Sequence, residues 1–266
     1  MTIEISARFS FFLPRPGDVL LHFEAAAIPE QTILSQHCQI GEAAHLARIP
    51  AQDNIGERIW LHAEGRHQIA YSASVAVNRI LARIADLDRL EPHALPGEAV
   101  QYLFDSRYCP ASQFQPFVEA EFGGLAGGAL VMAMRDWIAE TFRYVPGASN
   151  SQTTACDTFI DRRGICRDYA HVMVALARAA AIPARYVSVY DPGVTPQDFH
   201  AVAEMFLADP SIPGGGAWHM VDATRMADPA KSVKIGVGRD AADVSFMTVF
   251  GAADFGNKVV FASEKN

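Results

Sequence analysis

The sequence predicts an α+β fold in two parts: an N-terminal antiparallel β-sandwich-like domain, followed by helices packed on a second antiparallel sheet. Alternating apolar and polar runs, divided by Pro and Gly, predict strands from Thr2 to about Arg79. Two segments with apolar residues at helical spacing and three more β-type runs come later. Four prolines spread over residues 80–127 separate the two patterns, so we expect one domain over residues 1–90 and another over 91–266.

The N-terminal region is predicted to consist of short strands joined by tight turns. The runs IEISARFSFFL and DVLLHFEA are separated by Pro14, Pro16 and Gly17. Residues 57–77, ERIWLHAEGRHQIAYSASVAV, have two β-rich arms, which predicts a hairpin with Gly65 at its turn. Repeated short strands at this spacing are typical of an antiparallel sandwich.

The second region is predicted to contain two helices and then a sheet. Residues 129–145 form an amphipathic pattern, and a second helix is expected from Cys166 to about Ala181, before Pro183. The small and polar residues between these helices predict a loop. The runs ARYVSVYD, HAVAEMFL and AWHMVDA then predict three strands.

Composition and charge restrict the class of protein. The net charge of −8 makes nucleic acid an unsuitable partner, because phosphate binding requires clustered Lys and Arg. No apolar run approaches the roughly 18 residues of a membrane span, and the N-terminus, with Glu4, lacks the basic flank of a signal peptide. We therefore expect a cytoplasmic protein with no membrane partner, and the oligomeric state stays open. The cysteines are too scattered for a disulfide framework: Cys38, Cys109, Cys156 and Cys166.

Cys166, in the stretch GICRDYAH, lies at the first turn of the second predicted helix. Unpaired backbone N–H groups and the positive end of the helix dipole favour a thiolate at this position. Gly164 allows a sharp turn just before it. Cys166 is thus a candidate nucleophile, although a free cysteine in this position is also compatible with a small buried apolar residue.

A thiolate nucleophile needs a proton acceptor, and His200 at the start of HAVAEMF is the best candidate. If HAVAEMF and AWHMVDA form an antiparallel hairpin that pairs Glu204 with Trp218, then His200 lies opposite Asp222. Directly opposed Cβ atoms lie about 4.5–5.5 Å apart, so the carboxylate could orient the imidazole. A shift of this register by two residues is compatible with the sequence.

Other titratable residues fit a site less well. His171 lies five residues after Cys166 and diverges from it on the helix, which favours packing or capping, and His219 alternates away from Asp222. The spacing of Cys156, Cys166 and His171 matches no zinc motif. The glycine clusters match neither a P-loop nor a dinucleotide fingerprint, so we expect no metal and no cofactor.

Two long segments carry a family resemblance. The run from TTACDTFIDRRGICRDYAH through DFHAVAEMFL, followed by AWHMVDATRMADP, resembles the core of the bacterial transglutaminase-like family, whose members are often described as candidate cysteine proteases. SRYC at 106–109 and GRDAADVSF at 238–246 resemble further segments of that family, and the β-rich N-terminal residues resemble its usual first domain.

The resemblance implies a papain-like catalytic domain over residues 91–266. It implies Cys166 as nucleophile, His200 as general base and Asp222 as the orienting acid, the residues already selected by helix position and register. Gln152 is a candidate side-chain oxyanion donor beside the Cys166 N–H. Many relatives carry Trp where this chain has Val202, a change that affects packing only.

The expected function is hydrolysis of an amide bond in a peptide or protein substrate through a thioester on Cys166. Acyl transfer to an amine, as in a protein-glutamine acyltransferase, uses the same triad and is a second possibility. A third is a non-catalytic protein-binding module on the same fold, although the intact Cys-His-Asp set argues against it.

Overall fold

The computed structural model describes residues 1–211 and 215–265, and it has the predicted α+β fold with antiparallel sheets and helices. Six α-helices are described: α1 (Gly97–Val100), α2 (Gln115–Phe122), α3 (Gly127–Thr141), α4 (Ala155–Asp161), α5 (Cys166–Ala179) and α6 (Ala241–Val244). The described strands are β1 (Thr2–Leu21), β2 (Gln31–Gln39), β3 (His45–Pro50), β4 (Glu57–Val77), β5 (Arg143–Tyr144), β6 (Arg163–Gly164), β7 (Ala184–Tyr190), β8 (His200–Ala208), β9 (Gly216–Val221), β10 (Val233–Gly238), β11 (Met247–Phe250) and β12 (Asp254–Glu264).

Two long strands, β1 and β4, form the centre of a six-stranded antiparallel sheet. They pair from Thr2 opposite Ala76 to Leu21 opposite Ile59, with β11 and β12 beside β1 and with β2 and β3 beside β4. Alternate side chains along both strands are buried, as expected of a sheet with one face toward a core.

The prediction of short strands and of a hairpin at Gly65 was wrong. Residues 57–77 form one continuous strand, and β1 continues through its prolines. The β1–β4 register shifts between Leu13 and Gly17, where the chain bulges. Proline lacks the N–H that the strand pairing needs, so Pro14 and Pro16 fit at this bulge. On the partner strand, Gly65 lies opposite Leu13 and adopts a φ of 84°.

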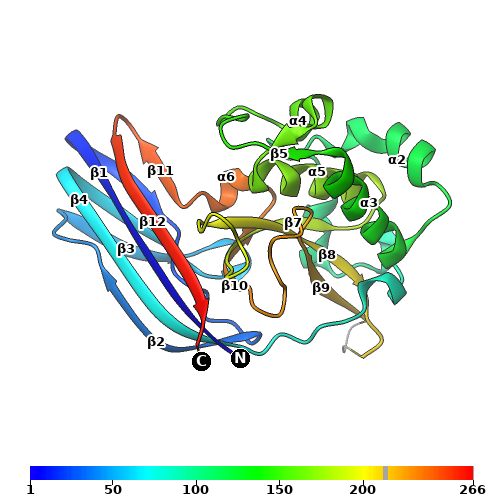
Figure 1. Ribbon diagram of the computed structural model, residues 1–266, viewed down its shortest axis with the longest axis horizontal. Helices are drawn as coiled ribbons and strands as arrows, with labels where there is room; N and C mark the ends of the chain where they lie inside the picture. The colour runs from blue at the N-terminus through cyan, green and yellow to red at the C-terminus, as the bar shows by residue number, and fades with distance from the viewer. Residues whose placement is uncertain (212–214, 266) are drawn as a thin grey trace.

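The second sheet has the order β10-β7-β8-β9 and is antiparallel throughout. Figure 1 shows the helices gathered on one side of this sheet, with the six-stranded sheet beside them. The predicted helices are present as α3 and α5, and the three predicted strands as β7, β8 and β9. Helix α5 is enclosed on all sides, because every residue from Asp168 to Arg178 is buried.

The segment between α3 and α5 was predicted to be a loop because its residues are small and polar, but it contains the helix α4. Thr154 caps α4 by accepting from the backbone N–H of Asp157, and the Asp157 carboxylate accepts from the Thr154 N–H in return. This reciprocal capping box stabilises a helix of only seven residues.

The C-terminal segment returns to the first sheet. Strand β12 pairs with β1 from Glu264 opposite Ile3, so the two chain ends lie together (Figure 1). Residues 247–264 were predicted to belong with the second domain, but their strand pairing places them in the sheet of the N-terminal strands. The predicted division at residue 90 therefore does not separate the two sheets along the chain.

No single helix of the described residues is long and apolar enough to cross a membrane. By length and composition, only the segments Ala111–Phe122 and Gly127–Thr141 meet the requirement, when they are taken together across a bend of 97°.

A buried histidine lies where the two sheets meet. A Cβ added at Gly236 of β10 would lie 2.2 Å from Cε1 of His22, so glycine is required for this close approach. Neither ring nitrogen of His22 has a hydrogen-bond partner among the described residues. Burial, together with the charge of Arg58, lowers the pKa of His22 to about 4.

We expect acid to destabilise the fold through His22. The pKa of His22 in the folded protein lies below the ordinary 6.5, so the unfolded chain binds this proton more tightly. The stability of the fold therefore falls as the pH drops through 6.5 toward 4. Between pH 7 and pH 5 this histidine should cost about 2 kcal/mol of unfolding free energy. Urea unfolding of His22→Gln should show a correspondingly weaker pH dependence, whereas His37→Gln, which removes an exposed histidine, should match the unmodified protein. Equal slopes for all three proteins would contradict this assignment.

Candidate active site

Cys166 is the first residue of α5, as the sequence predicts. Its neighbour Ile165 has extended backbone and donates its N–H to the Asp168 carboxylate at 2.8 Å. Ser149 donates to the same carboxylate at 2.5 Å, which fixes the helix start. A Cβ at Gly164 would lie 2.7 Å from the Asp168 Cβ, so the glycine before the cysteine allows this packing. The Cys166 side chain is half-buried at the positive end of the helix dipole.

His200 and Asp222 form a buried pair. The Nε2 of His200 lies 2.9 Å from Oδ2 of Asp222, and both side chains are almost wholly buried. The predicted register was shifted by two residues, because Glu204 lies opposite Met220 rather than Trp218. A shift of two keeps both side chains on the same face of the sheet, and diagonal neighbours remain within reach of a long side chain.

The Asp222 carboxylate is surrounded by donors. In addition to His200, it accepts from the backbone N–H and hydroxyl of Thr224 at 2.8 Å, and from the N–H groups of Met226 and Ala227 at 3.0 and 2.8 Å. Burial alone would raise its pKa, but these hydrogen bonds and the neighbouring imidazole lower it. Asp222 therefore stays ionised in a buried position.

The second imidazole nitrogen of His200 is not used by the pair with Asp222. This Nδ1 atom is buried and has no hydrogen-bond partner among the described residues. Burial would lower the pKa of His200, but the bond to Asp222 and the adjacent Cys166 sulfur raise it to about 10. The arrangement thus stabilises an imidazolium beside the sulfur.

Cys166 and His200 line a cleft of about 750 Å³ between the second sheet and the end of the first. Helix α5 contributes Cys166, β8 contributes His200, and β11 and β12 contribute part of the opposite wall, including Val249 and Lys258. Gln152 also lines the cleft, where its side chain is exposed.

Tyr144 is a site residue that the sequence did not indicate. It lies on β5, opposite Gly164 of β6, and it lines the cleft together with Cys166. Burial, followed by the charge of Cys166, raises its pKa, so the phenol keeps its proton. The segment was predicted to extend α3, and no local pattern could reveal its pairing with β6.

The other candidate histidines, His171 and His219, take no part in the His200–Asp222 pair. His171 is buried, stacks on Tyr108 and accepts from the Ala241 N–H at 3.2 Å, and burial lowers its pKa to about 3. His219 lies 3.7 Å from Asp209. In residues 1–211 and 215–265, no group of three or more His, Cys, Asp or Glu side chains is arranged to hold a metal ion.

We expect Cys166 to be the thiol that reacts at low pH. Burial raises the pKa of Cys38 and of Cys109 to about 12 and raises that of Cys156 as well, so these three thiols serve as internal controls. At pH 6, iodoacetamide should modify Cys166 about tenfold faster than an ordinary free thiol. Asp222→Asn lowers the pKa of His200 and should remove most of this advantage. Mass spectrometry of the alkylated peptides measures each rate, and modification of Cys166 no faster than a free thiol would exclude an activated cysteine.

Comparison with known proteins finds relatives of this chain in sequence and in structure. Residues 123–223 match the family model described as the transglutaminase-like superfamily. An uncharacterised protein of Mycobacterium leprae is 27% identical over 119 residues, covering 43% of this chain and 42% of that protein. One from Mycobacterium tuberculosis (strain ATCC 25618 / H37Rv) is 32% identical over 129 residues, covering 43% and 40%. The chain thus spans about two fifths of the length of these mycobacterial relatives.

A solved structure matches over almost the full length. The "Putative Cysteine Protease" of Cytophaga hutchinsonii superimposes with a TM-score of 0.89 at 31% identity, covering 99% of this chain and 90% of that chain. By this similarity and by the family model, the chain belongs to the bacterial transglutaminase-like family.

Proposed function

We propose that the protein is a cysteine hydrolase that cleaves an amide bond in a peptide or protein through a Cys166–His200–Asp222 triad. The observation that carries the proposal is the buried 2.9 Å pair between His200 and Asp222, which directs the free His200 Nδ1 toward the cysteine at the start of α5. The name of the Cytophaga hutchinsonii relative, "Putative Cysteine Protease", supports the same reaction class.

In the first step the Cys166 sulfur attacks the carbonyl carbon of the amide. The S–C bond forms, and the C–N bond breaks as the His200 Nδ1–H gives its proton to the leaving amine. A thioester then remains on Cys166, and His200 is neutral. Asp222 stays ionised throughout, so it stabilises the imidazolium before this step and holds the ring orientation after it.

In the second step a water molecule replaces the amine. Neutral His200 takes a proton from the water as its oxygen attacks the thioester, and the S–C bond breaks to release a carboxylic acid and restore the Cys166 thiolate. The reaction needs no cofactor, and its atoms balance with one water consumed per amide cleaved.

The carbonyl oxygen becomes negative in both steps and requires donors. The Cys166 N–H and the Tyr144 hydroxyl are the pair we favour, because Tyr144 lines the cleft with Cys166 and its phenol keeps its proton. Gln152 lines the same cleft, but its side chain is exposed. It therefore fits a position at the rim of the cleft better than the role of a buried oxyanion donor.

The test incubates the unmodified protein and Cys166→Ala with a peptide library and a labelled primary amine, and mass spectrometry reads the products. We expect cleaved peptides without amine incorporation, and loss of activity by about 1,000-fold or more in Cys166→Ala. Asp222→Asn should lower kcat by about 100-fold or more while the protein still folds. Tyr144→Phe should lower kcat more than Gln152→Ala does, since it removes one oxyanion donor.

Three results would overturn parts of this proposal. Incorporation of the amine in place of cleavage would make the protein an acyltransferase. Equal cleavage by Cys166→Ala would exclude the thioester. Absence of any product, together with unreactive Cys166 in the alkylation assay, would favour a binding module.

A further inference from the structure

The SRYC segment, residues 106–109, takes no part in the proposed reaction, yet it reaches into the same cleft. The backbone N–H of Ser106 donates to the carbonyl of Cys109 at 3.1 Å, and the N–H of Cys109 donates back at 3.2 Å. Arg107 and Tyr108 therefore form the tip of a closed two-residue loop, and both line the cleft with Cys166.

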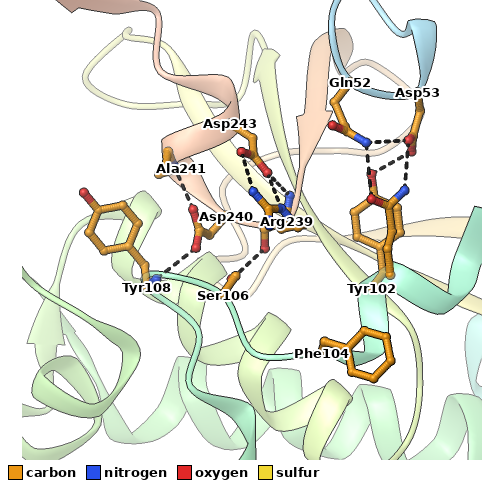
Figure 2. A network of polar contacts seen from close by, with 12 residues as sticks. Gln52, Asp53, Tyr102, Phe104, Ser106, Tyr108, Arg239, Asp240, Ala241 and Asp243 are labelled. Carbon is orange, nitrogen blue, oxygen red and sulfur yellow. Dashed lines mark hydrogen bonds and ion pairs between the residues drawn. The ribbon is translucent and has the colours of Figure 1, made fainter.

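The base of this loop is fixed to the core. The Arg178 guanidinium donates to the Ser106 hydroxyl at 3.1 Å, and Cys109 is fully buried with its thiol 3.5 Å from the carbonyl of His171. Figure 2 shows the Ser106 hydroxyl directed at the carbonyl of Arg239, a contact of 3.4 Å. The buried cysteine of SRYC thus has a structural role.

Tyr108 is held at every polar atom. Its N–H donates to Asp240 at 2.8 Å (Figure 2), its hydroxyl donates to the carbonyl of Ser151 at 2.8 Å, and its carbonyl accepts from the N–H of Ala155 at 2.8 Å. Its ring stacks on His171 with centroids 5.1 Å apart. Asp240 also accepts from the N–H of Ala242 in α6, so the loop and α6 are tied together.

Arg107 differs from the other cations that line the cleft, because none of the described residues neutralises it. Its guanidinium carbon lies 5.0 Å from the centroid of the Tyr108 ring, and in the described part of the chain it has no ion pair or hydrogen bond. The other charged lining residues are occupied: Arg167 binds Asp168, and Lys258 binds Asp198 at 2.6 Å. In a chain with a net charge of −8, this cleft presents an unpaired cation on a rigid loop.

We propose that Arg107 is a specificity-determining residue that binds a carboxylate of the substrate, so that the preferred substrates are peptides with an acidic group near the scissile amide. A planar guanidinium forms paired hydrogen bonds with a carboxylate, and stacking on a fixed aromatic ring reduces the entropy lost on binding. Every polar contact of Tyr108 serves to hold that ring in place. The proposal rests on the hydrolase function and extends it to a substrate class.

The test measures peptide binding to a protein without the nucleophile. Its result therefore does not depend on whether the protein is a hydrolase. Cys166→Ala protein is titrated with pairs of fluorescent hexapeptides that differ only by Glu or Gln at one position. We expect the Glu peptide of a pair to bind more tightly than its Gln partner when the varied residue is at one particular position of the hexapeptide, or at a position next to it. Adding Arg107→Ala should abolish this preference by weakening the Glu peptides about 10- to 100-fold, with the Gln peptides unchanged. Arg107→Lys should restore part of it.

The matched control is Arg66→Ala, which removes an exposed arginine of β4 that does not line the cleft and changes the net charge equally. It should leave the Glu preference intact. In the active protein, Arg107→Ala should raise KM for acidic peptides while kcat stays within about twofold, because Arg107 does not contact the reacting atoms. The absence of any Glu preference, or a preference that survives Arg107→Ala, would overturn the proposal even if the protein cleaves peptides.

Discussion

The hydrogen bond between His200 and Asp222 is the constraint on which the site depends. A buried carboxylate is costly unless donors surround it, and Asp222 is surrounded by the turn from Thr224 to Ala227 as well as by the imidazole. The carboxylate stays ionised, and the imidazole therefore holds its proton. The turn after β9 is thus as important to the site as the strand that carries His200.

The two sheets each supply part of the cleft. Strands β7 and β8 place His200 opposite the start of α5, while β11 and β12 close the other side after the chain returns to the first sheet. Buried charges join three strands of the second sheet, since Glu204 of β8 binds Arg185 of β7 and Lys234 of β10 at 2.7 and 2.6 Å. The burial of Glu204 opposes ionisation, but these two cations hold its pKa at about 2. The N-terminal strands are therefore structural partners of the cleft as well as a separate layer.

Features set by local sequence could be predicted, and those set by distant contacts could not. Helix α5 and its cysteine followed from spacing and from the dipole, and His200 and Asp222 followed from alternation along two strands. The predicted register between β8 and β9 was shifted by two residues, because the two strands pair as far as Ala208 opposite Gly216. The residues of the connecting loop did not indicate this end of the pairing. Tyr144 and Arg107 join the cleft only through long-range packing. The Gly65 turn was predicted wrongly because glycine fits a bulge in a long strand as well as it fits a hairpin.

The most direct test of the account is the protonation state of His200, followed by nuclear magnetic resonance of ¹⁵N-histidine-labelled protein as the pH is raised. The raised pKa predicts that both ring nitrogens stay protonated as the pH passes the ordinary 6.5, and that the proton is lost near pH 10. In Asp222→Asn the loss should move to lower pH. A neutral His200 at pH 7 in the unmodified protein would contradict the account, because no imidazolium would then stand beside the sulfur before the attack.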